Sequence, residues 1–178
     1  MNKTTNLILT CICMLTLSFT SCSSDDDSNE NNNPTRALQV EKLDGSVFQD
    51  GDIVTFNEVG TDDIRSDQGK LKYNLRNVSS QNINVKVEVM AIRGTDGSMF
   101  TFCIQPLCIF DVVVGGIYPG SGTIIEPGEV NSNDDYFINR DMGDGATSIE
   151  YDFRFFVEDE NGNQTDDLNI TYKYEPAI

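Results

Sequence analysis

The chain has no histidine and no tryptophan among its 178 residues. Without histidine, neither a Ser-His-Asp triad nor a Cys-His pair can form, and metal centres with imidazole ligands are excluded. Without tryptophan, the chain lacks the aromatic side chain that anchors the core of antibody-type domains and that most often stacks on sugars. These absences weigh against the common classes of hydrolase.

Basic residues are also scarce. Only 12 Lys and Arg stand against 29 Asp and Glu, which gives a formal net charge of −17 at pH 7. Binding to nucleic-acid phosphates or anionic lipid headgroups requires Lys and Arg to displace counterions, so no nucleic-acid partner is expected. Cations, neutral sugars and proteins stay open as partners. The simplest interpretation of the charge is that it keeps the protein soluble.

The first 21 residues show the pattern of an export signal. Lys3 supplies a short positive start, and an apolar run follows from Leu7 to Phe19. This run is shorter than the roughly 20 residues that a membrane-spanning helix needs. A cleaved signal peptide over residues 1–21 is therefore predicted.

Small residues and acidic residues flank Cys22. Thr20 and Ser21 precede it, and the run Ser23–Asp27 (Ser-Ser-Asp-Asp-Asp) follows it. This order resembles the lipobox of bacterial lipoproteins followed by the acidic export signal of Bacteroidota surface lipoproteins. The resemblance implies that Cys22 carries fatty acyl groups such as palmitate and becomes the first residue after cleavage. It also implies a lipid-anchored protein of the outer membrane that is exposed at the cell surface.

Residues 22–36 are predicted to form a flexible acidic linker. The stretch Ser23–Pro34 has no apolar side chain, so it cannot bury enough surface to offset the entropy of ordering. Fully extended, it reaches roughly 40 Å, enough to hold a domain clear of the headgroups. The remainder, residues 37–178, has a length that suits one domain.

From Ala37 onward, apolar residues alternate with polar ones. Four runs alternate clearly and six shorter runs do so weakly. The clear runs are Lys70–Arg76, Asn82–Ala91, Ile149–Glu158 and Asp167–Tyr174; the weaker ones are Leu38–Leu43, Ile53–Phe56, Ser98–Ile104, Cys108–Val114, Gly122–Ile125 and Tyr136–Ile138. Such alternation predicts strands with one buried and one wet face. Pairs such as Asp96-Gly97 and Asn161-Gly162 suit the tight turns between them.

Many short strands separated by turns predict an all-β fold, an antiparallel immunoglobulin-like β-sandwich of about 7–9 strands. The segments Phe100–Cys103, Cys108–Ile109 and Ile124–Glu129, with the two long closing strands, resemble small immunoglobulin-like sandwiches of secreted Bacteroidota proteins. That resemblance implies an adhesion, scaffolding or ligand-binding role and assigns no catalytic residue.

The cysteines sort by location. Cys11 and Cys13 fall in the signal peptide and Cys22 is expected to be lipidated, which leaves Cys103 and Cys108 as a pair. In an oxidising envelope compartment this pair predicts a disulfide. A redox pair usually has two intervening residues at a helix start, and structural zinc needs four ligands, so both alternatives are less favoured. The enclosed Ile104 and Leu107 are expected to be exposed at a hairpin tip, where they would offer a contact surface.

Two acidic turns are candidate calcium sites. Asp159, Asn161, Asn163 and Asp166 crowd oxygen side chains around one turn, and Thr61–Asp67 does so more loosely. Calcium takes six to eight oxygen ligands, which such turns can offer. Neither turn has the spacing of a known calcium loop, so calcium is the one cofactor left open.

The expected function is that of a non-catalytic cell-surface module for binding, adhesion or scaffolding, with a protein or glycan partner. One alternative is a hydrolase that uses two carboxylates about 5–10 Å apart. In that case Tyr118, Tyr136 and Phe137 would replace tryptophan as sugar platforms. Another alternative is a partner-dependent subunit of an envelope assembly. No acid pair stands out, which favours binding over hydrolysis.

Overall fold

A computed structural model describes residues 36–63, 65–131 and 135–177. The regular secondary structure of these residues consists of β-strands. The clearest alternating runs become the long strands β5 (Ile83–Arg93), β11 (Ile149–Glu158) and β12 (Gln164–Tyr174). The described ranges contain no helix, and hence none long and apolar enough to cross a membrane. The all-β prediction is confirmed. The predicted signal peptide, Cys22 and nearly all of the predicted linker lie outside the described residues.

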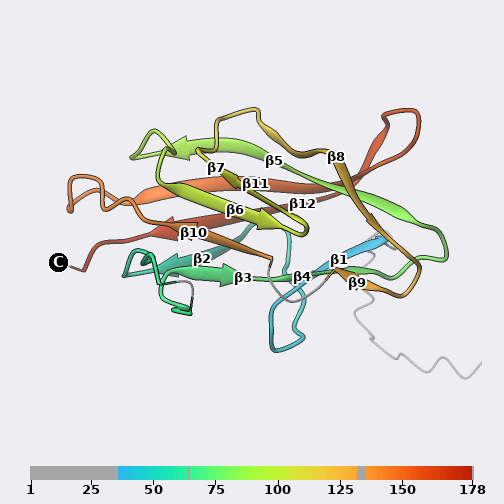
Figure 1. The fold of residues 1–178 in the computed structure, drawn as a ribbon, viewed down its shortest axis with the longest axis horizontal. Helices are drawn as coiled ribbons and strands as arrows, with labels where there is room; N and C mark the ends of the chain where they lie inside the picture. Colours follow the sequence, from blue (N-terminus) through green and yellow to red (C-terminus); the bar gives the residue numbers. More distant parts are fainter. Residues whose placement is uncertain (1–35, 64, 132–134, 178) are drawn as a thin grey trace, which may run out of the picture. The chain divides into compact units, whose positions relative to one another are not determined.

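One layer of the sandwich is a five-stranded sheet (Figure 1). Its strands are, in spatial order, β2 (Asp52–Phe56), β12, β11, β5 and β8 (Ile117–Ile125). Most neighbours are antiparallel, as predicted, but β2 pairs with β12 in parallel. The prediction of a wholly antiparallel sandwich was therefore wrong at this edge. The loop after β1 carries the chain from one layer to the other, so β2 reaches β12 in the same direction.

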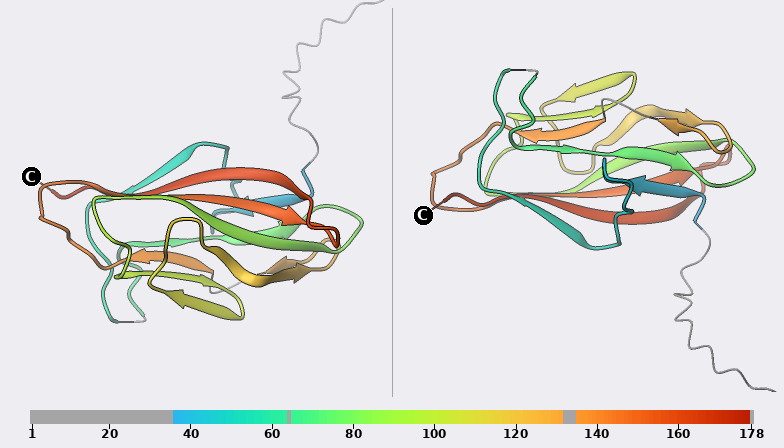
Figure 2. Two further views of the ribbon diagram at one scale, coloured as in Figure 1. Left: turned by 90° about the horizontal axis from the view of Figure 1, so that it is seen from above. Right: turned by 90° about the horizontal axis from the view of Figure 1, so that it is seen from below.

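The second layer combines two smaller sheets that share one interrupted strand. The four-stranded sheet has the order β3 (Lys70–Lys72), β10 (Tyr136–Asn139), β6 (Phe100–Ile104) and β7 (Leu107–Phe110). The three-stranded sheet has the order β1 (Leu38–Glu41), β4 (Asn74–Asn77) and β9 (Val130–Asn131). Only Tyr73 separates β3 from β4, and its N–H donates to the Asp135 carbonyl at 3.1 Å. Figure 2 shows the two layers edge-on.

The β-sandwich is confirmed, and its strand number exceeds the prediction. The described residues form twelve strands in three sheets, against the about 7–9 expected. The single run Lys70–Arg76 divides at Tyr73 into β3 and β4, which pair with β10 and β9 respectively. A break in pairing, rather than a change in hydrophobic pattern, thus accounts for one extra strand. The two-residue β9 lies where no strand was predicted.

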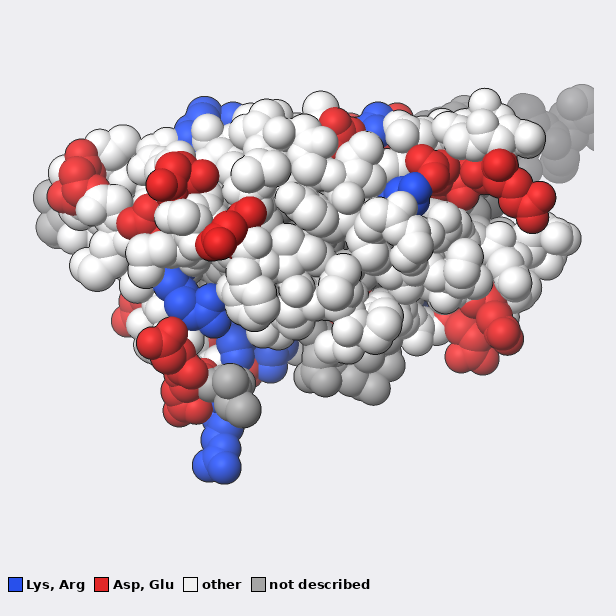
Figure 3. Space-filling model, turned by 45° about the horizontal axis from the view of Figure 1, so that its top comes forward, with Lys and Arg blue, Asp and Glu red and all other residues white. Residues whose placement is uncertain are grey.

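Charge is unevenly spread over the surface. Figure 3 shows acidic groups gathered toward both ends of one face, with a broad uncharged area between them. Lys and Arg cluster at one lower corner of the same view. The acidic surface that composition predicts is therefore interrupted by at least two regions of different character.

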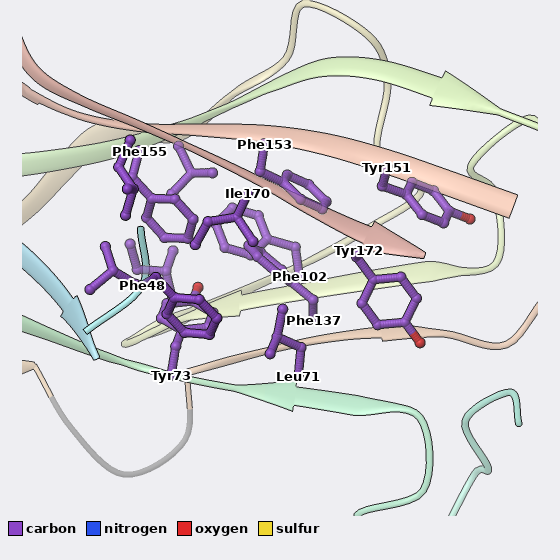
Figure 4. Packing of buried hydrophobic residues seen from close by; sticks show 14 of the residues in the cluster. Phe48, Leu71, Tyr73, Phe102, Phe137, Tyr151, Phe153, Phe155, Ile170 and Tyr172 are labelled. Atoms are coloured by element: carbon purple, nitrogen blue, oxygen red, sulfur yellow. The ribbon is translucent and has the colours of Figure 1, made fainter. Parts of the chain in front are cut away.

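Aromatic rings fill the space between the layers (Figure 4). Phe137 of β10 stacks on Phe153 of β11, with ring centroids 4.1 Å apart, and so joins the two layers directly. Phe100, Phe102, Tyr73, Tyr151 and Tyr172 surround this pair and are all buried. The rings come from the inward positions of both layers, as the alternation predicts.

Candidate functional site

Two strand edges border a groove on one side of the sandwich. Among the described residues, β2 pairs only with β12 and β3 only with β10, so each has one edge without a neighbouring strand. Between them lies an open groove of about 600 Å³. Its walls come from β2, from β3 and from residues 42–48 after β1. We call it the β2–β3 groove.

The backbone of β2 turns part of its hydrogen-bonding groups toward the open edge. The carbonyl of Phe56 accepts from the Glu175 N–H at 2.8 Å, just beyond β12. Residues that face the partner strand alternate along a parallel pair, so the N–H and C=O of Ile53 and Thr55 face away from β12. The side chains of Ile53 and Thr55 are exposed as well. This edge is therefore open to a further strand.

The floor of the groove is apolar. Phe48, Val54, Phe56 and Leu71 contribute to it. Phe48 is 2% exposed, and Phe56 stacks on Tyr172 with ring centroids 4.8 Å apart. These rings belong to the core and do not form a free platform for sugars.

Three lysines rim the groove. Lys42 Nζ lies 5.0 Å from the centre of the Phe48 ring, and Lys70 Nζ lies 5.3 Å from that of Tyr136. Lys72 pairs with Asp67 at 2.5 Å, and this hydrogen bond lowers the pKa of the Asp67 carboxyl. Asp44 is the other carboxylate of the lining. Cations thus outnumber anions here, on a strongly acidic protein.

Sequence reasoning missed this groove. Lys70 and Lys72 alternate with Leu71 on one strand, which marks a polar face but not what it borders. Lys42 lies far away in the sequence and reaches the groove only through the turn after β1. The Lys-Leu-Lys pattern in so acidic a chain was the available signal.

The predicted disulfide between Cys103 and Cys108 is present and joins β6 to β7. The Tyr73 hydroxyl donates to the Cys103 carbonyl at 3.0 Å, and the Gln105 N–H donates to Asp135 Oδ1 at 2.7 Å. Both bonds hold the hairpin against its own layer. The cysteines therefore have a structural role, as the spacing predicts.

The prediction that Ile104 and Leu107 are exposed at the hairpin tip is right for one of the two residues. Leu107 is 45% exposed, whereas Ile104 is completely buried. Ile104 was wrongly predicted to be exposed, because β6 lies between β10 and β7 and turns Ile104 into the core. Of the two strands of this hairpin, β7 presents apolar side chains to the solvent, whereas every residue of β6 is buried.

The four calcium candidates do not converge. Asp159 accepts hydrogen bonds from the N–H groups of Asn161 and Asn163, both at 2.8 Å, within its own turn. Hydrogen bonds from Asn163, foremost that of its side chain at 2.7 Å, lower the pKa of Asp159. Asp166 instead accepts from the Ala37 N–H at 2.7 Å and so ties the start of β1 to β12. Calcium binding by these residues stays a prediction.

The looser acidic group is also occupied by local bonds. Asp63 accepts from the Arg65 N–H at 2.9 Å, and Asp67 pairs with Lys72. Within the described residues, no group of three or more His, Cys, Asp or Glu side chains is arranged to hold a metal ion. Asp159 and Asp63 therefore accept hydrogen bonds within their own turns, whereas Asp166 and Asp67 bond to residues outside them.

The pKa values of the described carboxyl groups bear on the hydrolase alternative. Seven of these groups have a lowered pKa: Asp44, Asp50, Asp67, Asp96, Asp144, Asp152 and Asp159. Two-carboxylate glycoside hydrolysis needs one acid whose pKa is raised, so that it can donate a proton near neutral pH. Phe137, considered above as a sugar platform, is completely buried, so that interpretation was wrong.

No protein-family model matches the chain, and no curated protein matches it. Among solved structures, it is similar to the CooA pilin subunit from enterotoxigenic Escherichia coli, with 9% identity, a TM-score of 0.39 and coverage of 80% of this chain and 99% of that one. It is also similar to a CsuC–CsuE chaperone–tip adhesion subunit pre-assembly complex from the archaic chaperone-usher Csu pili of Acinetobacter baumannii. There the identity is 11% and the TM-score 0.34, over 71% of this chain and 54% of that one. Likenesses of this degree assign neither a function nor a partner to this chain.

Proposed function

We propose that this protein is a non-catalytic binding module of the cell surface, which holds an extended segment of a protein partner in the β2–β3 groove. The observation that supports this proposal is the pair of open strand edges beside an apolar floor and a rim of lysines. Main-chain hydrogen bonds to an open edge give affinity, and the side-chain contacts give selectivity.

The groove also suggests the sequence of the bound segment. An extended peptide added to β2 would bond to the backbone of Ile53 and Thr55 and turn every second side chain toward the sandwich. Those side chains would meet Phe48 and Leu71 on the floor, which favours apolar residues. Acidic residues beside them would come close to Lys42 and Lys70. We therefore expect an alternation of apolar and acidic residues.

A protein partner suits the groove better than a glycan. Sugars bind through free aromatic faces and dense side-chain hydrogen bonds, and the rings here pack into the core. The groups that the groove does offer are backbone donors and acceptors in the repeat of a β-strand. This repeat matches a polypeptide.

The proposed location rests on the N-terminal sequence. Lipid on Cys22 would anchor the protein in the outer membrane, and two or three acyl chains make such an anchor effectively permanent. The acidic linker would then hold the domain in the surrounding medium, where the groove can meet a partner. A partner-dependent place in an envelope assembly is compatible with this arrangement.

A synthetic peptide of alternating Val and Glu is expected to bind the mature chain at 0.15 M salt. Its Val-Lys counterpart should bind at least about tenfold more weakly, because like charges would meet at the lysine rim. The net charge of the whole protein favours the Val-Lys peptide, but the Debye length at this salt is only about 8 Å. Fluorescence anisotropy measures both affinities, and slower hydrogen exchange of the β2 amides locates the site. Stronger binding of the Val-Lys peptide contradicts the proposal.

Two sets of variants control this experiment. Thr55→Pro removes an N–H that faces away from β12 and should abolish binding, whereas Thr55→Val keeps the N–H and should bind normally. If Thr55→Pro lowers the melting temperature, Lys42→Glu/Lys70→Glu gives an independent test. That double variant is expected to prefer the Val-Lys peptide. An unchanged preference in the folded double variant counts against the groove.

Mass spectrometry of the protein from its native membrane is expected to find an N-terminal peptide that begins at Cys22 and carries fatty acyl groups. Cys22→Ala should release the protein from the membrane fraction. As a control, Cys11→Ala should be processed and anchored normally, because that residue is removed with the signal. An unmodified Cys22 overturns the proposed anchor without affecting the groove.

A further inference from the structure

The segment from Gly97 to Ile125 carries a single charged residue, Asp111, in a chain in which 23% of residues are charged. It contains β6, β7 and β8. β7 is the outer strand of the four-stranded sheet and β8 that of the five-stranded sheet, at the ends opposite β3 and β2. This segment therefore brings a single charge to its side of the sandwich, away from the β2–β3 groove. Two charged residues from outside the segment, Arg140 and Asp62, lie beside Phe110 there. We call this side, formed by Gly97–Ile125, the uncharged flank.

Apolar side chains stand exposed on the uncharged flank. Phe110 is 67% exposed, Val114 60%, Val113 56% and Leu107 45%. Exposed apolar side chains on an edge strand make that edge a template for strand pairing.

The backbone of β7 leaves two residues free to pair outward. Only Gln105 and Pro106 connect β6 to β7, and the Cα atoms of Cys103 and Cys108 are 4.0 Å apart. That short spacing is typical of a non-hydrogen-bonded antiparallel pair. Since the two kinds of pair alternate, Leu107 and Ile109 bond to β6, while Cys108 and Phe110 turn their N–H and C=O away from it.

We propose that the uncharged flank binds a second copy of this chain, with β7 antiparallel to the β7 of the other copy about a twofold axis. A twofold interface must present the same patch on both molecules, and an antiparallel edge pair does so. The free groups would pair Cys108 of each copy with Phe110 of the other and set Ile109 opposite itself. The two four-stranded sheets would become one, and each Phe110 ring would lie beside the sulfur of the opposing Cys108.

Charge limits where two copies can meet. Two copies of so acidic a chain repel each other wherever carboxylates meet, so close approach is least unfavourable at a face with few carboxylates. The single carboxylate, Asp111, would lie opposite Leu107 of the other copy. The two Asp111 groups would then be about 13 Å apart along the strands, beyond the Debye length of about 8 Å. An anionic membrane surface attracts Lys and Arg. The segment Gly97–Ile125 has neither, and the neighbouring Arg140 pairs with Asp62 at 3.5 Å.

Sedimentation velocity of the mature, lipidated chain in mild detergent tests the dimer. The wild-type chain is expected to sediment as a dimer over a range of concentrations. Phe110→Glu should raise the dimer dissociation constant about a hundredfold or more, because it sets a carboxylate in an apolar interface. The matched control Met142→Glu, at an apolar residue outside the flank that is 58% exposed, should dimerise normally.

Cross-linking in native membranes tests the register. Ile109→Cys should give a disulfide-linked dimer on non-reducing gels, since residues of a non-hydrogen-bonded pair lie within disulfide reach. Met142→Cys should give none. Any of three results overturns the proposal. The wild-type chain is monomeric, the Phe110→Glu variant dimerises as tightly as wild type, or the Ile109→Cys variant fails to cross-link. A monomer that binds neutral phosphatidylcholine vesicles through Phe110 overturns it in favour of a lipid. Thr55→Pro should leave the dimer intact, which separates this inference from the groove.

Discussion

Replacing Phe137 by alanine is expected to lower the free energy of unfolding by about 3–5 kcal/mol, which is the usual cost of removing a buried phenylalanine. Phe137 is completely buried in β10 and stacks on Phe153 of the opposite layer at 4.1 Å. Its ring centroid also lies 5.0 Å from those of Phe102 and Tyr73. Truncation opens a cavity between layers that rigid strands cannot close. The total free energy of unfolding of a domain of this size is only about 5–15 kcal/mol, so the loss is severe.

Urea unfolding measures this cost, and two variants control it. Phe137→Leu fills most of the cavity and should cost clearly less than Phe137→Ala. Met142→Ala, at a residue that is 58% exposed and lies outside the uncharged flank, should stay within about 0.5 kcal/mol of wild type. The slope of the free energy of unfolding against urea concentration should not change, because the same surface is exposed on unfolding. A loss below about 1 kcal/mol for Phe137→Ala would show that the two layers can close over the missing ring.

The alternating runs predicted most of the fold because burial acts residue by residue along a strand. Ile149–Glu158 became β11 with unchanged bounds, and Asp167–Tyr174 became the greater part of β12. What alternation does not contain is the identity of the neighbouring strand. Nothing in Ile53–Phe56 distinguishes a parallel partner from an antiparallel one, and nothing in Lys70–Arg76 announces the interruption at Tyr73. Both features depend on where other segments arrive.

The candidate sites likewise divide into those that local sequence predicts and those that depend on how distant segments meet. The Cys103–Cys108 disulfide followed from counting thiols, which is a local and compositional argument. The β2–β3 groove needs Lys42, Ile53 and Lys70 to meet, and their meeting depends on the change of layer after β1. The uncharged flank could have been found, because a stretch with one charge is visible in the sequence. Its position on two sheet edges could not.

The acidic turns show why metal sites are overpredicted from sequences that are rich in oxygen-bearing side chains. Asp159 accepts hydrogen bonds within its own turn, and such local bonding is one of the reasons for which Asp is common in turns. Asp166 accepts from the backbone of Ala37, which is 129 residues away in the sequence. A carboxylate whose acceptors are filled by the protein has less to offer a cation. Sequence alone does not show which acceptors are filled.

Three tyrosine hydroxyls lie in the core and donate to buried acceptors. Tyr172 donates to the Gly69 carbonyl at 2.7 Å, Tyr151 to Asn139 Oδ1 at 3.0 Å and Tyr73 to the Cys103 carbonyl at 3.0 Å. Burial disfavours a phenolate and raises the pKa of all three above the ordinary value of 10. Each hydroxyl also serves as a donor, so ionisation would remove a bond that the fold uses. The folded protein therefore keeps all three protonated in mildly alkaline solution.

Alkaline unfolding is the expected consequence. In the unfolded chain these tyrosines ionise near pH 10, whereas in the folded domain they stay neutral to higher pH. Their contribution to stability is thus fully present below pH 10 and falls as the pH rises above it. The slope is about 1.4 kcal/mol per pH unit for each group, or about 4 kcal/mol for the three together. Circular dichroism and the phenolate absorbance should change together between about pH 10 and 12, and Tyr172→Phe should reduce the slope by about one third. Ionisation of Tyr73, Tyr151 and Tyr172 while the circular dichroism of the folded domain persists would mean that the core admits water or charge, against the packing in Figure 4.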